Sequence, residues 1–298
     1  MKPSLAAAIL VAALAAIACG APPMTGIPAF SPPATPSPVG PPTQALVPWD
    51  GFPADQSPRP VVLIGNSSPQ DGFSSGEAKT AASCHKFQAG VVLSKTSPGQ
   101  AQASWGTYVS LYPAISAADA LAAMMKPSTA TADPLCSSVQ PLTVTAARFG
   151  GFEFATDRGR AVIYSWLFKV SGANGEMAYP ALPSSALWNA DLAHGASDGG
   201  ATLSDRPSAL NFTFWGAPSG TGPCGAQYTA LVAESRAAVA VAIKAIPNAS
   251  PGDLVACPAI AQERTVLVTL VSPLAGRVLV NASGAAVRVC PAGSPRGC

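Results

Sequence analysis

Apolar and polar residues alternate along several stretches of the chain, with the spacing that is typical of β-strands. The clearest stretch lies at residues 161–170, and its alternating members are Val162, Tyr164, Trp166, Phe168 and Val170. It follows the segment Phe152-Glu153-Phe154-Ala155 across a polar turn at 156–160, and the two segments together predict a β-hairpin. Aromatic and β-branched side chains on such a strand usually pack a core. A ligand groove lined by the same face is the alternative.

The chain beyond residue 208 shows the strand pattern throughout. The predicted strands are 210–214, 228–234, 238–243, 265–271 and 277–281. A tight turn at Ser235-Arg236 and a loop at 272–276 divide the last four strands into two hairpins, so we expect a small antiparallel sheet. Alanine favours helix over 230–246. The alternation of Val239, Val241 and Ile243 nevertheless favours a strand there.

The preceding part of the chain mixes strand and helix signals. A buried strand is predicted at 61–64, and Ser74 followed by Glu77 resembles a capping box that opens a helix toward Cys84. A second helix is expected after Ser116, with Asp119 in its first turn. Its apolar positions are Ala120, Leu121, Met124 and Met125, and Lys126-Pro127 ends it.

These elements predict an α+β fold that is mostly antiparallel β. We expect an N-terminal α+β domain at 49–200, followed by a small antiparallel β domain at 201–298. With 48% hydrophobic residues, the chain has enough apolar side chains to build a sizeable core.

The N-terminus carries an export signal. One lysine precedes an apolar stretch at 5–18, which is shorter than the roughly 20 residues of a membrane-spanning helix. The stretch ends at Ala16-Ile17-Ala18-Cys19, which resembles the lipobox of bacterial lipoproteins. The resemblance implies a signal peptide at 1–18, acylation (palmitate) of Cys19 and a lipid anchor on the extracytoplasmic side of the cell membrane. The alternative is an ordinary secretory signal in which Cys19 is incidental.

A proline-rich tract follows the predicted anchor. Between Gly20 and Pro48 the chain has no Lys, Arg, Asp or Glu, and many prolines. Such a composition cannot build a core and favours an extended, semi-rigid polyproline II conformation. We therefore interpret residues 19–48 as an acylated cysteine followed by a spacer that lifts the folded part off the membrane.

Charge and cysteine content narrow the function classes. A formal net charge of +2 and 11% charged residues are too little to suggest nucleic acid. Six cysteines remain besides Cys19, and an even number in an oxidising compartment indicates disulfides. The simplest pairing is sequential, namely Cys84–Cys136, Cys224–Cys257 and Cys290–Cys298. No C-x-x-C spacing occurs, so we expect neither a metal nor a cofactor.

Several segments of the last half of the chain resemble a recurring pattern in uncharacterised lipoproteins of high-GC Gram-positive bacteria. The matching residues are 156–159, 166–172, Cys224, Tyr228, Glu234-Ser235, 264–266 and 273–278. They are turn and strand residues and not catalytic ones. The resemblance therefore implies a lipoprotein and a β-rich fold, and it adds no activity.

Candidate catalytic residues are few. The two histidines, His85 and His194, lie in no G-x-S-x-G, P-loop or dinucleotide-binding context. A Ser-His-Asp triad remains possible, because geometry and not chain order defines it. We expect His85 to be a helix end near a disulfide and His194 to lie in an exposed loop. Acid pairs are a further alternative, although the sequence cannot give their separation.

Two function classes remain. The first is a non-enzymatic surface module that binds a small molecule, a cell-wall component or another exported protein, with Trp188 and Tyr179 as candidate contacts between the domains. A packed linker is the alternative for these two residues. The second is a hydrolase acting on cell-wall or extracellular polymers. A deep pocket with a histidine beside a serine or carboxylate would favour the hydrolase. A sheet face that exposes Trp188, Trp215 or Tyr179 would favour binding.

Overall fold

The computed structural model describes residues 42–65, 69, 71–126, 134–188, 199–249 and 256–294. The predicted signal peptide at 1–18, Cys19, His194 and Cys298 lie outside these ranges. Val39–Cys298 forms one compact unit. No helix within the described ranges combines the length and the apolar composition needed to cross a bilayer.

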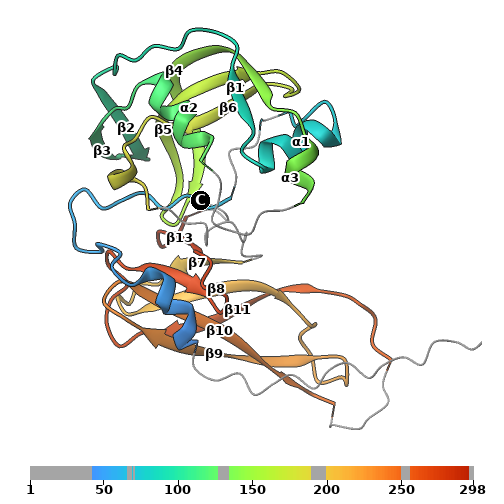
Figure 1. Cartoon of the computed structure of the whole chain (residues 1–298). Helices are drawn as coiled ribbons and strands as arrows, with labels where there is room; N and C mark the ends of the chain where they lie inside the picture. Colours follow the sequence, from blue (N-terminus) through green and yellow to red (C-terminus); the bar gives the residue numbers. More distant parts are fainter. Residues whose placement is uncertain are drawn as a thin grey trace, which may run out of the picture. The chain divides into compact units, whose positions relative to one another are not determined.

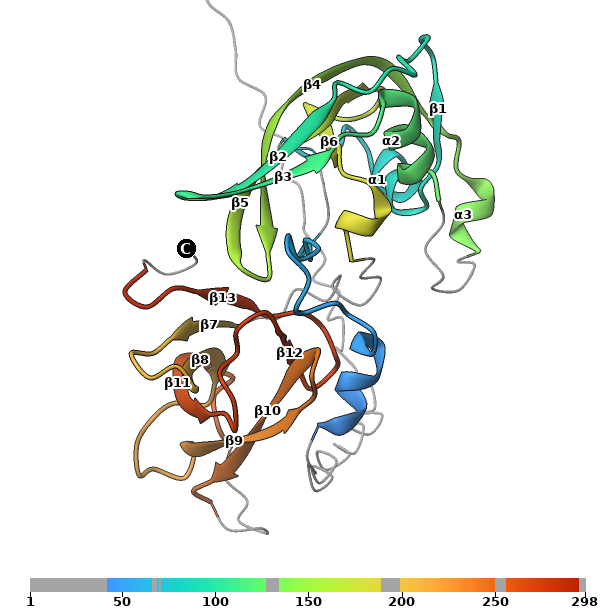
Figure 2. The same ribbon diagram turned by 90° about the vertical axis from the view of Figure 1, so that its left-hand side faces the viewer.

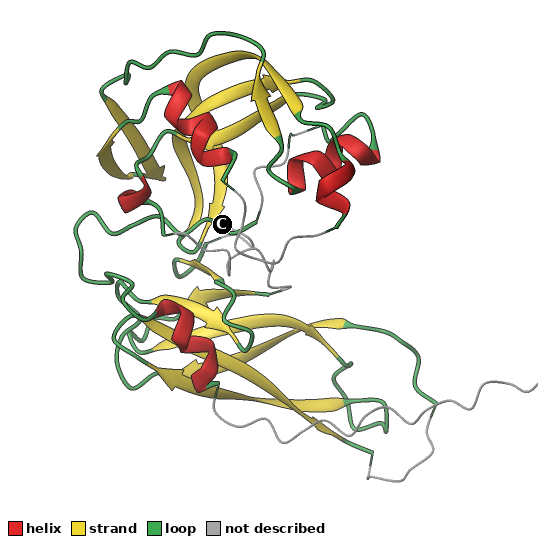
Figure 3. Cartoon of the chain, viewed as in Figure 1, coloured by secondary structure: helices red, strands yellow, loops and turns green. Residues whose placement is uncertain are grey.

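The described part of the chain is mostly β-sheet with mostly antiparallel pairing, as predicted (Figure 3). Its helices are η1 (Thr43–Trp49), α1 (Gly76–Ser83), α2 (Ala117–Met124), α3 (Leu135–Ser138) and η2 (Ser184–Ala186). Its first six strands are β1 (Phe87–Ala89), β2 (Gln100–Trp105), β3 (Tyr108–Pro113), β4 (Leu142–Thr156), β5 (Gly159–Val170) and β6 (Glu176–Pro180). Its other strands are β7 (Gly200–Leu203), β8 (Ala209–Gly216), β9 (Ala226–Glu234), β10 (Ala238–Pro247), β11 (Gln262–Thr269), β12 (Val278–Asn281) and β13 (Arg288–Cys290).

The first sheet is built on the predicted hairpin. Strands β4 and β5 pair antiparallel down to Thr156 and Gly159, and Gly159 supplies the positive φ of 96° that closes the turn. The strand order is β1-β4-β5-β2-β3, and β6 pairs with the second half of β5 (Figure 1). The β1–β4 pair is parallel.

The alternating face of β5 is only half buried. Trp166, Phe168 and Val170 lie in the core as predicted, but Val162 and Tyr164 are 44% and 39% exposed. The second half of β5 pairs with β6, and helix α2 packs on β6. The alternation correctly predicts the strand, but it does not show which part of β5 is covered by β6 and α2.

Both predicted helices form, with one corrected start. Ser116 caps α2 by accepting the Asp119 N–H at 3.2 Å, as expected, although Met125 is 41% exposed and not a core residue. Helix α1 is capped by Ser75, so the capping box predicted at Ser74 is wrong. The Ser74 hydroxyl donates instead to the Gly172 carbonyl at 3.2 Å.

Residues 61–64 are mostly buried, but they do not form a strand of a sheet. Val61 and Leu63 make isolated bridges with Leu187 and Thr156. Val61 packs into the core of the first sheet, whereas Val62 packs into a second core that includes β10 and β12. The apolar run therefore passes between two cores, which explains why both neighbouring valines are buried.

The C-terminal strands form two sheets and not one (Figure 2). Their orders are β12-β10-β9 and β11-β8-β7-β13, and apolar side chains from both sheets share a core. The β9–β10 hairpin and the strand interpretation of 230–246 are confirmed. The predicted hairpin of 265–271 with 277–281 is wrong, because β11 pairs with β8 and β12 pairs in parallel with β10. The loop at 272–276 crosses from one sheet to the other.

The chain is already folded where the spacer was predicted to end. Residues Thr43–Trp49 form helix η1, which packs on β10 and β12 with Ala45 and Trp49 buried. The Trp49 indole N–H donates to the Gly284 carbonyl at 2.8 Å. Of the predicted spacer, residues 43–48 therefore belong to the folded part.

Two predicted disulfides are confirmed. Cys84–Cys136 and Cys224–Cys257 both have Cα atoms 5.4 Å apart. Cys290 is also disulfide-bonded. The third predicted pair includes Cys298, which lies outside the described residues.

Candidate functional site

A buried ionic cluster lies at the β4–β5 turn. Asp157 and Arg59 are 3% and 7% exposed. Arg59 forms an ion pair with Asp157 through Nη2 and donates to the Gly276 carbonyl through Nη1. Arg158 lies over the Trp105 ring at 3.9 Å, with its Nε 3.9 Å from Asp157 Oδ1.

Backbone hydrogen bonds show that this cluster joins separate segments of the chain, and we call such a cluster a structural tie. The Asp157 N–H donates to the Val62 carbonyl at 3.1 Å, and the Asp157 carbonyl accepts the Val289 N–H at 2.9 Å. Burial lowers the pKa of Arg158, and the Asp157 carboxylate opposes that shift. Because these contacts join segments that are distant in sequence, we infer that the cluster holds the fold together.

A second ion pair, between Glu234 and Arg277, also joins separate segments of the chain. Glu234 accepts the Val271 N–H at 2.6 Å and pairs with Arg277 Nη1 at 2.7 Å. Burial alone would raise the pKa of Glu234, but these donors bring it below its ordinary value. Arg277 also donates to the Ser272 and Pro273 carbonyls. Glu234 and Arg277 therefore hold the loop at 272–276 in place.

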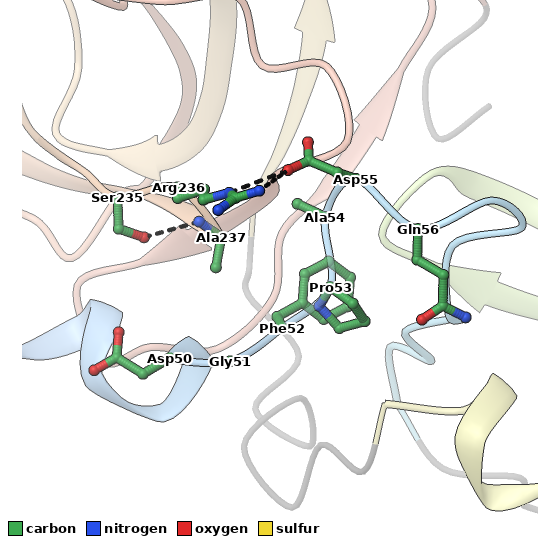
Figure 4. Close-up of a pocket in the computed structure, with 10 residues that line it drawn as sticks. All are labelled: Asp50, Gly51, Phe52, Pro53, Ala54, Asp55, Gln56, Ser235, Arg236 and Ala237. Carbon is green, nitrogen blue, oxygen red and sulfur yellow. Dashed lines mark hydrogen bonds and ion pairs between the residues drawn. The ribbon is translucent and has the colours of Figure 1, made fainter.

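A hollow of about 390 Å³ lies between the segment after η1 and the β9–β10 turn (Figure 4). Its polar groups already bind one another: Arg236 donates to Asp55 Oδ2 at 2.9 Å, and the Ser235 hydroxyl accepts backbone N–H groups of the turn. The Arg236 and Asp55 side chains are 89% and 72% exposed. The hollow is open, and its charges pair across it, so it is a weak candidate for enclosing a ligand.

The described histidine lies where the sequence places it. His85 follows Cys84 of the first disulfide, and its Nδ1 lies 2.9 Å from the Met124 carbonyl oxygen. This contact joins the end of α1 to the end of α2. His194 lies outside the described residues.

The two predicted binding aromatics are separate from one another. Trp188 is half-buried and contacts Trp49 and Phe52, with ring centroids 6.4 and 5.2 Å apart. Tyr179 is half-buried against the core of the first sheet, opposite Trp166, and burial raises its pKa. The structure packs both rings into different clusters and does not bring them together.

An exposed tryptophan lies elsewhere, on the outer face of β8 and β11. Trp215 is 59% exposed and is paired in register with Glu263. The next pair on this face is Thr213 with Thr265, whose hydroxyl oxygens are 3.4 Å apart, and the pair after it is Asn211 with Leu267. We call these six residues the Trp215 face.

The opposite side of the same strands is the core side. Leu210 and Phe212 are buried, Phe214 packs on the same core, and its ring meets Tyr228 edge-on at 4.9 Å. Because strand residues alternate between faces, Asn211, Thr213 and Trp215 must point outward. The core packing on the opposite side therefore holds the Trp215 face in place. This face presents one aromatic ring, hydroxyls, an amide and a carboxylate.

The alternation of 210–214, continued by one residue, places Trp215 on the outward side, although the candidate contacts predicted from the sequence are Trp188 and Tyr179. In the described ranges, no three His, Cys, Asp or Glu side chains cluster so as to hold a metal ion. Comparison with family models, curated proteins and solved structures finds no match to this chain. The candidate site thus depends on its geometry alone.

Proposed function

We propose that this chain is an exported lipoprotein, anchored through acylated Cys19 to the extracytoplasmic side of the cell membrane. In this proposal it is a non-enzymatic binding module whose Trp215 face takes a neutral polysaccharide of the cell wall. The apolar stretch at 5–18 and the lipobox-like residues before Cys19 support the anchor. The chemistry of the Trp215 face supports the ligand class.

The exposed ring of Trp215 is the observation that carries the proposal. An indole ring offers a large rigid surface with a negative π face. The C–H groups on one side of a pyranose ring carry the complementary partial positive charge. Threonine hydroxyls and the Asn211 amide both donate and accept hydrogen bonds, as sugar hydroxyls do. The row from Trp215 through Thr213 to Asn211 therefore matches a sugar chain lying along strand β8.

Other ligand classes fit this face less well. Its two large apolar side chains, Trp215 and Leu267, are separated by the threonine pair, whereas a protein interface of about 800 Å² per partner has a contiguous apolar core. The face carries no lysine or arginine of its own, so it offers nothing to anionic lipid or an anionic polymer. A neutral, hydroxyl-rich ligand remains the best match.

We also propose that the folded part divides near residue 200 into an α+β domain and a β domain. In this division the second domain presents the Trp215 face. Helix η1 and Val62 pack on β10 and β12, so the segment before the first sheet contributes to the second domain. The spacer between Cys19 and residue 42 would then set the distance of the Trp215 face from the membrane.

Cell fractionation tests the anchor. Cys19→Ser should release the protein from the membrane fraction and abolish palmitate labelling, because the acyl chains supply the membrane affinity. The wild-type chain, fractionated in parallel, is the control. A Cys19→Ser protein that still labels with palmitate and partitions into detergent would refute the lipoprotein assignment.

Co-sedimentation with purified wall polysaccharide tests the ligand class. Trp215→Ala should weaken the affinity at least about tenfold, because loss of the one aromatic contact of this face costs more than about 1.4 kcal/mol. Tyr164→Ala is the matched control, since Tyr164 is also an exposed strand aromatic and lies on the other sheet. Equal binding by wild type and Trp215→Ala would refute the proposed face.

The hydrolase alternative has its own readout in the same assay. Release of soluble fragments by the wild-type chain, lost on His85→Ala or His194→Ala, would replace the binding module with a hydrolase. We expect no such release, because the described contacts of His85 are those of a helix end.

A further inference from the structure

We propose that the free edge of β3 is a self-association edge, through which two copies of this chain pair antiparallel around a two-fold axis at Ser110. Strand β3 is the last strand of the first sheet (Figure 1). Its side chains include Tyr108, Val109 and Leu111, which are 55%, 47% and 54% exposed. An open strand edge flanked by exposed apolar side chains is a ready template for another strand.

The hydrogen-bond pattern shows which backbone groups face outward. The Ala114 N–H donates to the Gly99 carbonyl at 3.0 Å, in line with the β2–β3 register. Because bonded and non-bonded pairs alternate in an antiparallel ladder, Ser110 bonds to Ala103, whereas Val109 and Leu111 point their N–H and C=O groups away from β2. Within the described ranges no other strand pairs with β3.

Pro113 supports this assignment independently. It is the next residue of β3 with the same parity as Val109 and Leu111, and it lies opposite Gln100 in a position that needs no N–H for the β2 ladder. Proline within a sheet is confined to such outward-facing edge positions. The outward edge therefore ends at Pro113, and Val109 and Leu111 are its complete hydrogen-bonding residues.

The sequence of the edge is nearly symmetric about its centre. Tyr108-Val109-Ser110-Leu111-Tyr112 reads with the same residue classes in either direction. Around a two-fold axis at Ser110, Val109 of each copy lies opposite Leu111 of the other, and each pair exchanges both backbone bonds. Their exposed side chains lie on one face of the joined sheet, so they form a continuous apolar strip. This self-complementarity favours a second copy over an unrelated strand.

A hollow lies where the second copy would place its aromatic ring. In this register Tyr108 of the second copy lies opposite Tyr112. Tyr112 is one of the residues that line a hollow of about 230 Å³, together with Pro58, Leu111 and Pro183. The exposed Tyr108 ring would approach this largely apolar hollow, once in each copy, as an isologous interface requires.

Sedimentation velocity on the purified chain tests the proposal. We expect a dimer fraction that rises with concentration in the wild type and is lost in Val109→Pro, which removes one outward N–H and leaves the β2 ladder intact. The Leu111→Lys variant should also remain monomeric, because each dimer interface would then bury two lysine ammonium groups. Val92→Lys is the control, since Val92 is 100% exposed and lies outside every strand.

Hydrogen exchange gives a readout that does not depend on the variants folding. In the wild type, the Val109 and Leu111 amides should exchange more slowly as the concentration rises, while other exposed amides do not change. Oxidation of Ser110→Cys should cross-link two copies faster than oxidation of Leu111→Cys, because only Ser110 faces its own symmetry mate. A wild type that stays monomeric, a dimer that survives in Val109→Pro, or faster cross-linking through Leu111→Cys would overturn the proposal.

Discussion

Replacing Asp157 with asparagine should destabilise the fold far more than replacing any exposed acid. The carboxylate is the counter-charge to two guanidinium groups: Arg59 is 7% exposed and ion-paired to it, and Arg158 lies 3.9 Å away. Asparagine keeps the shape of the side chain but leaves both cations without a partner charge. Removing one member of a buried pair costs about 3–5 kcal/mol, mainly because the other charge stays buried.

The matched control is Asp55→Asn. Asp55 also pairs with an arginine, but its side chain and that of Arg236 are 72% and 89% exposed. Solvent screening limits such a pair to below about 1 kcal/mol. A third variant, Arg59→Met with Asp157→Asn, removes both charges of the buried pair. It should cost clearly less than the sum of the two single changes, because neither charge is then left buried alone.

The assay is urea unfolding at pH 7, followed by tryptophan fluorescence, with the free energy of unfolding compared at constant m-value. Similar losses for Asp157→Asn and Asp55→Asn would refute the assignment of the buried cluster as a structural tie. Full additivity of the Arg59 and Asp157 changes would refute the proposed coupling between them.

Three further predictions follow from particular contacts. Replacing both cysteines of Cys84–Cys136 or of Cys224–Cys257 with alanine should each lower the free energy of unfolding by about 4 kcal/mol, slightly more for the first pair, since the sequence separations are 52 and 33. Urea unfolding of the two double variants measures both losses. The lowered pKa of Glu234 gives stability that is fully present above its ordinary pKa of 4.5 and is lost as the pH falls through the lower pKa of the folded state. Glu234→Gln should therefore flatten the acid limb of the stability–pH profile, and an unchanged limb would contradict the Glu234 contacts. Gly276→Ala should cost roughly 1–3 kcal/mol in a thermal melt, because a Cβ there would overlap the Ala54 carbonyl, whereas Gly222→Ala meets open space and should be nearly neutral.

Local signals in the sequence predicted individual elements well. The alternation at 161–170 and at 239–243 depends only on the period of a strand, and both segments are strands. Such local signals did not predict every pairing between strands. Residues 265–271 and 277–281 look like a hairpin because they are adjacent in sequence, but Arg277 binds Glu234 and directs the loop toward the other sheet. No local pattern encodes that contact.

The candidate site shows the same limit. Trp188 lies in a stretch rich in proline and alanine between the two predicted domains, which suggested a ligand contact in a cleft. Its burial depends on Trp49 and Phe52, which lie more than a hundred residues earlier in the chain. The exposure of Trp215, by contrast, follows from the alternation of Leu210, Phe212 and Phe214 along one strand.

Indole N–H resonances give the most direct test of the proposed binding module. The chain has five tryptophans, Trp49, Trp105, Trp166, Trp188 and Trp215, so ¹⁵N-indole labelling gives one reporter in each environment. On titration with a soluble neutral wall oligosaccharide, we predict that the Trp215 resonance moves with saturation while the other four stay in place. A titration that leaves Trp215 unmoved, or that shifts Trp188 instead, would contradict the account.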